Sequence, residues 1–348
     1  MATTMEELTN TISIIFKQRV ANLIKTGDKG IVLYATKNAA QTADVVVKEF
    51  TSALSIDGVT DPIKAKIKQI FLGEAKKVIC VTYKTTFETA AESINKKYFN
   101  WLACDIADDL ADVVALAKEK NYKTVVFNIK ADEKHIVNFT NPSVTDTAGT
   151  VITAVNYIPR IVGALAGLSY DCSASALTFS DLSDVAKPTV IDEGAFILYV
   201  KEDKVKVAAP VNSLTTLTEN VTEDMKSITI VEGMDRTEYD IRYAFDNSYK
   251  GKYKNKYDNQ SLFIGAVKEY FRQLAKLNIL DPEYANTCEV DIEEQKAAWI
   301  ASGKDEATVR AWDALTTKKM TYKKKLFLAC DVKYLDAMEA LQFTINMY

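Results

Sequence analysis

The chain has 348 residues, of which 48% are hydrophobic and 26% are charged. This composition predicts a globular protein that is long enough for about two domains. The net charge of −4 argues against a general nucleic-acid-binding protein, for which a basic domain is expected.

No stretch of the sequence indicates export or a membrane span. No apolar run approaches the roughly 20 residues that cross a bilayer, and the start MATTMEELTN lacks the basic residues and apolar core of a signal peptide. We therefore expect a protein that is kept in the cytosol until another process releases it, without inserting into a membrane. The five cysteines are widely scattered, which favours reduced core thiols over a disulfide framework.

Residues 8–16, near the N-terminus, alternate between apolar and polar side chains. Ile12, Ile14 and Phe16 share one side of an extended segment, and threonine or serine side chains occupy the other. A period of two is typical of a half-buried strand. The segment is therefore predicted to be a terminal strand that precedes the first domain.

From residue 30 to residue 168, apolar runs alternate with helical patterns. Strands are predicted at 30–36, 77–83, 101–106 and 123–129, and helices at 61–73, 86–99, 107–121 and 149–168. Pro159 is expected to break or kink the last helix, and its small residues GALAG (163–167) permit close helix packing. Strands that alternate with helices indicate an α/β layer structure with a largely parallel sheet.

Beyond residue 190, the predicted strands come in pairs. The predicted elements are a hairpin at 194–211, a strand leading into a helix at 226–249, a long amphipathic helix at 259–280, a strand at 288–292, short helices at 293–303 and 305–315, and two strands within 324–348. Trp299 and Trp312 lie in the two short helices, where packing in a core or an interface is expected.

The chain ends in ALQFTINMY, residues 340–348, which again has the period of a strand. Leu341, Phe343, Ile345 and Met347 fall on one side. Chain ends usually fray unless something holds them, so this strand requires a partner. The pattern alone leaves two kinds of partner open: another part of the same chain, or a second copy.

Few residues in the α/β region carry catalytic chemistry. The single histidine, His135, supplies no serine triad or histidine metal site, and a surface or loop position is expected for it. No glycine-rich phosphate loop follows a predicted strand. The acidic residues Asp105, Asp108, Asp109 and Asp112 fit a charged helix start better than a cation site. We therefore expect no cofactor and no catalytic residue.

Lysines gather between residues 316 and 325, within an otherwise acidic chain. Lys318, Lys319 and Lys323 are members of this group. The group fits either a solvated loop or an electrostatic patch for an acidic partner, and composition does not decide between them.

Residues 211–271 contain three motifs: Asn212-Ser213-Leu214, KSITIVEGMD (226–235), predicted as a strand and turn, and YKGKYKNKYDN (249–259). In these motifs the segment resembles the C-terminal sheath domain of contractile phage tail sheath proteins. The branch it resembles most is the short XkdK-like one, which also supplies the sheaths of R-type bacteriocins such as diffocins. The resemblance continues through 288–299 and 326–347. The motif residues are Glu232, Gly233, Met234, Asp235, Asp240, Arg242, Tyr257, Asp258 and Asn259.

The resemblance implies stacked hexameric rings around an inner tube, and contraction that drives the tube through a target cell envelope. It also implies α/β and α+β architecture, with a C-terminal domain completed by strands exchanged between subunits. The implied partners are other copies of the chain, the tube protein, and baseplate, terminator or collar proteins. The implied location is the producing bacterium's cytoplasm during assembly, and then a phage tail or a released bacteriocin particle.

The resemblance favours four segments: an N-terminal arm (1–22), an α/β middle domain (23–190), a C-terminal sheath domain (191–332) and a C-terminal arm (333–348). Ile12, Ile14, Phe16, Leu341, Phe343, Ile345 and Met347 are then the apolar side chains of the donated strands. Lys318, Lys319 and Lys323 are candidate contacts to the tube, because screened charge contacts suit a surface that must release its partner.

Two alternative functions remain. One is a cytosolic α/β enzyme with an unusual active site near Asp105 or Asp108. The other is a scaffold that oligomerises by strand exchange and does not contract.

Overall fold

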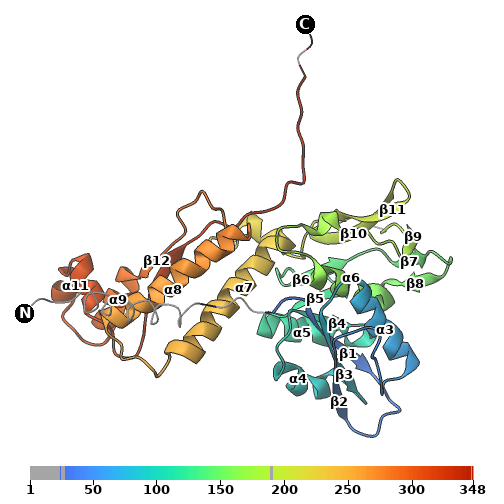
Figure 1. The fold of residues 1–348 in the computed structure, drawn as a ribbon, viewed down its shortest axis with the longest axis horizontal. Coiled ribbons are helices and arrows are strands. Elements are labelled where there is room, and N and C mark those ends of the chain that lie inside the picture. Colours follow the sequence, from blue (N-terminus) through green and yellow to red (C-terminus); the bar gives the residue numbers. More distant parts are fainter. Residues whose placement is uncertain (1–23, 25–27, 189–190, 346, 348) are drawn as a thin grey trace, which may run out of the picture. The chain divides into compact units, whose positions relative to one another are not determined.

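A computed structural model describes residues 24, 28–188, 191–345 and 347 and contains two compact units (Figure 1). The larger unit comprises Asp28–Glu232 and the chain end Asp336–Tyr348. The smaller unit comprises Gly233–Leu335 together with Met1–Gly27. The predicted N-terminal strand, with Ile12, Ile14 and Phe16, lies outside the described residues.

The larger unit is built on an eight-stranded sheet in the order β11-β10-β6-β5-β4-β1-β3-β2. Neighbours from β10 to β3 pair in parallel, whereas β2 and β11 pair antiparallel at the two edges. The strands are β1 (Ile31–Lys37), β2 (Val45–Phe50), β3 (Lys77–Tyr83), β4 (Trp101–Cys104), β5 (Lys123–Phe127), β6 (Ile136–Phe139), β10 (Ala195–Lys201) and β11 (Lys204–Ala209). The inner strands are buried along nearly their whole length, as parallel strands covered on both faces must be.

Helices cover both faces of this sheet (Figure 1). One pair, α3 and α6, packs together, and the other pair, α4 and α5, does the same. Their bounds are α3 (Asp61–Leu72), α4 (Phe87–Asn95), α5 (Leu110–Lys120) and α6 (Ala154–Gly167). The layered α/β arrangement predicted from the alternating pattern is therefore confirmed. Pro159 lies inside α6 and does not end it.

Close packing between α3 and α6 depends on glycines. A Cβ atom at Gly163 would overlap the backbone of Ile70 in α3, and a Cβ atom at Gly167 would overlap the backbone of Gly73. The helices thus approach closely because α6 carries no side chain at these two positions. This confirms the interpretation of GALAG as a contact surface between helices.

The larger unit extends further along the chain than the predicted middle domain. Strand β10 pairs in parallel with β6, through Ala195↔Asn138 and Phe196↔Phe139, so the predicted boundary after residue 190 falls within this unit. A hairpin pattern shows that two strands pair with each other, but it does not show which sheet they join. A smaller antiparallel sheet contains β7 (Ser143–Asp146), β8 (Val151–Thr153) and β9 (Leu182–Val185).

The segment after β11 is fastened to the larger unit by polar contacts. Asp132 accepts hydrogen bonds from the backbone N–H groups of Thr216 (2.9 Å) and Thr215 (2.7 Å). Hydrogen bonds from Thr216 and Thr215 hold the pKa of Asp132 well below its ordinary value. Asn212 donates to the carbonyl oxygen of Met225 (2.7 Å). Ser213 donates to that of Glu133 (3.0 Å). The Asn212-Ser213 motif therefore holds this loop in place.

The smaller unit combines two long helices with a two-stranded antiparallel sheet. Its elements are α7 (Ile228–Ala244), which begins in the larger unit, a π-helical turn (Phe245–Tyr249), α8 (Tyr257–Lys276), β12 (Thr287–Val290), α9 (Ile292–Ala301), α10 (Glu306–Arg310), α11 (Ala314–Lys319) and β13 (Leu328–Asp331). Tyr270 of α8 donates a hydrogen bond to Asp240 of α7 (2.7 Å). Helix α8 also packs against β12.

Two local predictions in this unit are wrong. The expected strand within 226–235 is the start of α7, where Ser227 accepts a hydrogen bond from the backbone N–H of Ile230 (3.4 Å). Burial of Ile228, Val231 and Glu232 on one helical face outweighs the strand preference of β-branched residues. The helix expected over 305–315 is two helices, because Asp313 caps the start of α11.

Candidate intersubunit site

The C-terminal segment leaves its apolar side chains without cover. Exposure is 88% at Leu341, 75% at Phe343, 69% at Ile345 and 90% at Met347. Within the described part of the chain, no strand pairs with residues 336–345. A row of four nearly bare apolar side chains marks an interaction site.

This segment is fixed at its base. Lys333 accepts a hydrogen bond at its carbonyl oxygen from the N–H of Asp281 (2.8 Å), and Leu335 donates to the carbonyl oxygen of Ile279 (3.1 Å). The chain is therefore held by backbone bonds up to Leu335. Tyr334 also pairs with Leu280 in this ladder, and beyond it Glu339 accepts a hydrogen bond from the hydroxyl of Ser173.

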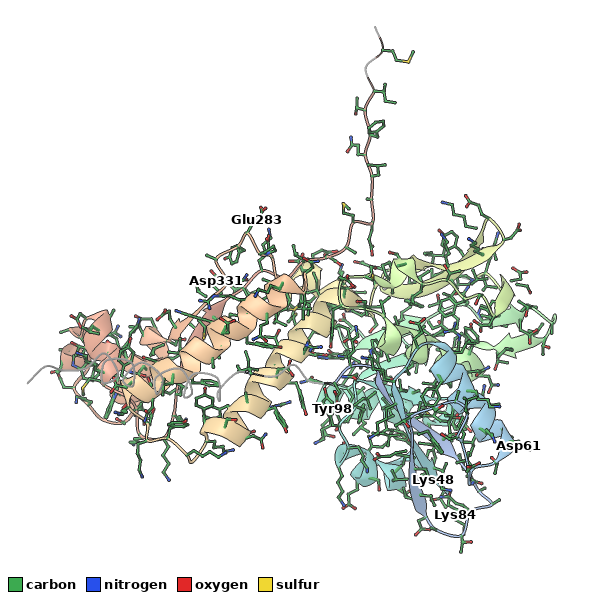
Figure 2. The ribbon with its side chains drawn as sticks, viewed as in Figure 1. Lys48, Asp61, Lys84, Tyr98, Glu283 and Asp331 are labelled. Carbon is green, nitrogen blue, oxygen red and sulfur yellow. The ribbon has the colours of Figure 1, made fainter. Side chains whose placement is uncertain are left out.

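The sheet formed by β12 and β13 has open edges. No third strand joins it within the described residues, and Ala329, Cys330 and Asp331 of β13 are exposed. Asp331, labelled in Figure 2, accepts a hydrogen bond from the hydroxyl of Tyr284 (2.8 Å). Unpaired N–H and C=O groups along a sheet edge form a template for another strand.

The predicted lysine patch lies next to a second lysine-rich loop, residues 250–256. The side chain of Asn255 donates to the carbonyl oxygens of Tyr322 (3.3 Å), Lys323 (3.1 Å) and Lys325 (3.0 Å). This clamp brings the lysines of 250–256 next to those of 323–325. The sequence contains both lysine groups, but only the fold shows that they share one surface, which we call the basic surface (250–256 and 319–325).

The three candidate tube contacts differ in their surroundings. Lys318 is an internal partner, since its ammonium group lies 3.0 Å from Glu289 and its side chain is 23% exposed. That contact raises the pKa of Lys318. Lys319 and Lys323 are exposed, and Lys323 lies over the ring of Tyr322. Of the three, Lys319 and Lys323 are therefore better placed to meet a partner.

The motif residues mostly hold the fold together. Buried Glu232 accepts a hydrogen bond from the indole of Trp101 and lies 3.5 Å from the ammonium of Lys123. Gly233 fits against Ile279 and Tyr334. Burial and the neighbouring Asp240 raise the pKa of Tyr270. These contacts assign structural rather than binding roles to the centre of the motif.

The outer motif residues lie at helix ends and on the surface. Arg242 pairs with Glu238 (3.3 Å), and Asp258 pairs with Lys256 (3.1 Å). Asn259 donates to the carbonyl oxygen of Lys254 (2.8 Å). Tyr257 begins α8, while Met234 and Asp235 are partly buried in α7. The motif is not gathered into one cluster.

Residues 220–348 match the phage tail sheath C-terminal domain family. The chain is also 29% identical over 369 aligned residues to the tail sheath protein of Clostridium phage phiCD119, covering 97% of this chain and 98% of that protein. The chain is thus similar to a tail sheath protein along nearly its whole length, and its residues 220–348 match the C-terminal domain of that family. The resemblance seen in residues 211–271 is thereby confirmed at the level of the family.

Solved structures agree with the fold of this chain. It matches the sheath tail protein of Listeria innocua with a TM-score of 0.63 and 14% identity, covering 93% of this chain and 99% of that one. It matches the sheath complex of an extracellular contractile injection system, in the contracted state, with a TM-score of 0.63 and 11% identity over 92% and 93% of the two chains. At these identities the likeness concerns the fold.

Two of the predicted acidic residues, Asp105 and Asp109, are tied into the fold. Asp105 accepts hydrogen bonds from the hydroxyls of Tyr34 (2.8 Å) and Thr36 (2.8 Å), and Asp109 accepts one from Tyr83. Within the described residues, no group of three or more His, Cys, Asp or Glu side chains could hold a metal ion. The tyrosines and the threonine thus give these carboxylates a structural role.

His135 differs from its predicted surface position, because only 3% of it is exposed. Its Nδ1 atom lies 3.1 Å from Glu133, in a turn directly before β6. A loop position was expected, but the burial of the histidine was not visible in the sequence. Among the helices described, none is both long and apolar enough to cross a membrane.

Proposed function

We propose that this sheath protein polymerises as stacked hexameric rings around an inner tube and contracts to drive the tube through a target cell envelope. In this function the C-terminal arm (336–348) of one copy pairs with an open edge of the β12–β13 sheet in a neighbouring copy. Backbone hydrogen bonds supply affinity, and alternate side chains fill apolar pockets. A head-to-tail contact that does not close on itself produces a helical filament.

One observation carries this proposal: the exposure of Leu341, Phe343, Ile345 and Met347 on a segment that has no strand partner among the described residues. Burying such side chains contributes about 1.5–3 kcal/mol each. The base of the arm is held by Lys333 and Leu335, so a pull on the arm reaches the folded unit directly. Connections of this kind allow neighbouring bodies to move while they remain joined.

The proposed tube contact is the basic surface, with Lys319 and Lys323 as its members from the predicted patch. Lys324 and Lys325 are also exposed there. Exposed charges interact weakly and are screened by salt. A tube held by such contacts can be released during contraction, whereas a large apolar interface would resist release.

We infer that the particle is the tail of a phage or a released bacteriocin of the R type, assembled in the cytoplasm of the producing bacterium. The XkdK-like branch fits the resemblance of residues 211–271. Baseplate, terminator and collar proteins are the partners at the two ends. The protein acts by assembly, without catalysis and without binding nucleic acid.

Negative-stain microscopy of the purified full-length protein tests the proposal. The expected result is wide-lumen tubes for the natural sequence and compact soluble particles for a variant lacking residues 341–348. Circular dichroism of the truncated variant should show an unchanged fold, because the side chains of Leu341, Phe343, Ile345 and Met347 are largely exposed within the described part of the chain. Tubes of normal length from the truncated protein would overturn the arm's role.

A further inference from the structure

Cys288 and Cys330 lie close together in the structure, although they are far apart in the sequence. They lie directly opposite each other in the ladder of β12 and β13, and their sulfur atoms are 2.8 Å apart. Both are free cysteines; Cys288 is buried and Cys330 is exposed. The expectation of reduced core thiols therefore describes Cys288 but not Cys330.

The register places these cysteines where a covalent link fits. Asp291 donates its N–H to the carbonyl oxygen of Phe327 (3.0 Å), which marks 291 and 327 as a hydrogen-bonded pair. Hydrogen-bonded and non-hydrogen-bonded pairs alternate along an antiparallel ladder, so 288 and 330 form a non-hydrogen-bonded pair. Such pairs have Cα atoms about 4.5 Å apart, which lies within the range that disulfides span.

We propose that Cys288 and Cys330 are a modification site that closes to a cross-strand disulfide when the protein meets a small-molecule disulfide such as oxidised glutathione. The Cys330 thiolate attacks one sulfur of the small disulfide, forms a mixed disulfide and releases one thiolate. Cys288 then loses its proton to solvent and attacks the sulfur of Cys330, releasing the second small thiol. Two protein thiols are oxidised and one small disulfide is reduced to two thiols.

The order of attack follows from the surroundings of the two sulfurs. The sulfur–sulfur contact with Cys288 lowers the pKa of Cys330, whereas the same contact, together with burial, raises the pKa of Cys288. The exposed member is therefore the better nucleophile, and the buried member is the resolving thiol.

The other three cysteines provide no equivalent pair. Burial raises the pKa of Cys80 and of Cys104 to about 12 each, so both stay protonated and unreactive. Cys172 is partly exposed, and burial together with the neighbouring Asp171 raises its pKa. It therefore serves as a matched control.

The link would close the segment between β12 and β13, which carries α9, α10, α11 and part of the basic surface. Cys330 is the second-last residue of β13, close to the point where the chain continues towards the arm. If the arm bears load, which rests on the proposed function, the link stops β13 from peeling away from β12. Formation of the link itself does not depend on assembly.

Thiol mapping of the unassembled full-length protein tests the proposal. After treatment with oxidised glutathione, a tryptic digest without reductant should contain peptide 277–296 joined to peptide 326–333. Cys330→Ser should abolish this product, and Cys172→Ser should leave it unchanged. Cys288→Ser should instead trap glutathione on Cys330, because the resolving thiol is missing.

Three results would overturn the proposal. One is a lasting glutathione adduct on Cys330 in the natural sequence without the joined peptides. Another is a link that involves Cys172, and the third is no reaction at either cysteine. The mapping uses single subunits, so its outcome is distinct from any failure to form tubes.

Discussion

Replacing Phe343 by alanine tests the donated arm at a single side chain. Phe343 is 75% exposed within its own chain, so most of its apolar surface is available for burial in a neighbour. Fully burying such a side chain contributes up to about 3 kcal/mol, and three quarters of that is about 2 kcal/mol. This free energy corresponds to roughly a 30-fold rise in the critical concentration for polymerisation. The folded subunit should keep its thermal stability.

The assay is sedimentation of polymer across a concentration series, with microscopy to identify the pelleted material. Thr344→Ala is the matched control, because Thr344 lies next along the arm and falls on its opposite side. That control should shift the critical concentration far less. Equal shifts for the two variants would refute the argument that one side of the arm enters a pocket.

Three further predictions address the basic surface, the helix contact and the polar loop. Lys323→Glu should weaken attachment to the tube about fivefold at low salt. The control Lys68→Glu makes an equal change of charge on α3 and should not weaken attachment. Cosedimentation with tube protein at two salt concentrations measures both variants. Gly163→Ala should lower the free energy of unfolding by about 1–3 kcal/mol through overpacking. The control Gly265→Ala has open space around its Cβ position and should not lower it. Calorimetry of the two variants measures the difference. Asp132→Asn should lower the melting temperature at pH 7. Because the folded pKa of Asp132 is depressed, this difference should shrink as the pH falls below about 4, and a difference that stays constant with pH would contradict the assignment.

The strands of the larger unit were predictable where their burial requires a local run of apolar residues in the sequence. The runs at 30–36 and 77–83 become β1 and β3, because a strand covered on both faces needs a continuous apolar sequence. The edge strand β2 was missed, since its Val45–Phe50 segment is only partly buried. Pairing partners that are distant in the chain, such as β10 with β6, leave no local pattern at all.

The sequence predicts those features of the candidate site that follow from residue periodicity. It does not show the features that depend on contacts between distant segments. Period two predicts the apolar side of the arm, and this stays a prediction. Lys318 was chosen from composition, which does not reveal its pairing with Glu289. The second basic loop was missed because Asn255 joins two segments that are 67 to 70 residues apart. A lone asparagine in a lysine-rich stretch gives no sign of such a clamp.

The arm and the β12–β13 sheet each lack what the other supplies. The arm has an ordered apolar pattern, ending in Ile345 and Met347, that no contact within the described chain explains. Among the described residues no third strand pairs with the sheet, and an exposed edge is a hazard unless a strand covers it. In an isolated subunit, neither the exposed apolar side chains of the arm nor the exposed sheet edge adds to the stability of the fold. Under the proposed function, both features become stabilising when copies associate, and the apolar side chains of the arm then serve assembly rather than the fold of one subunit.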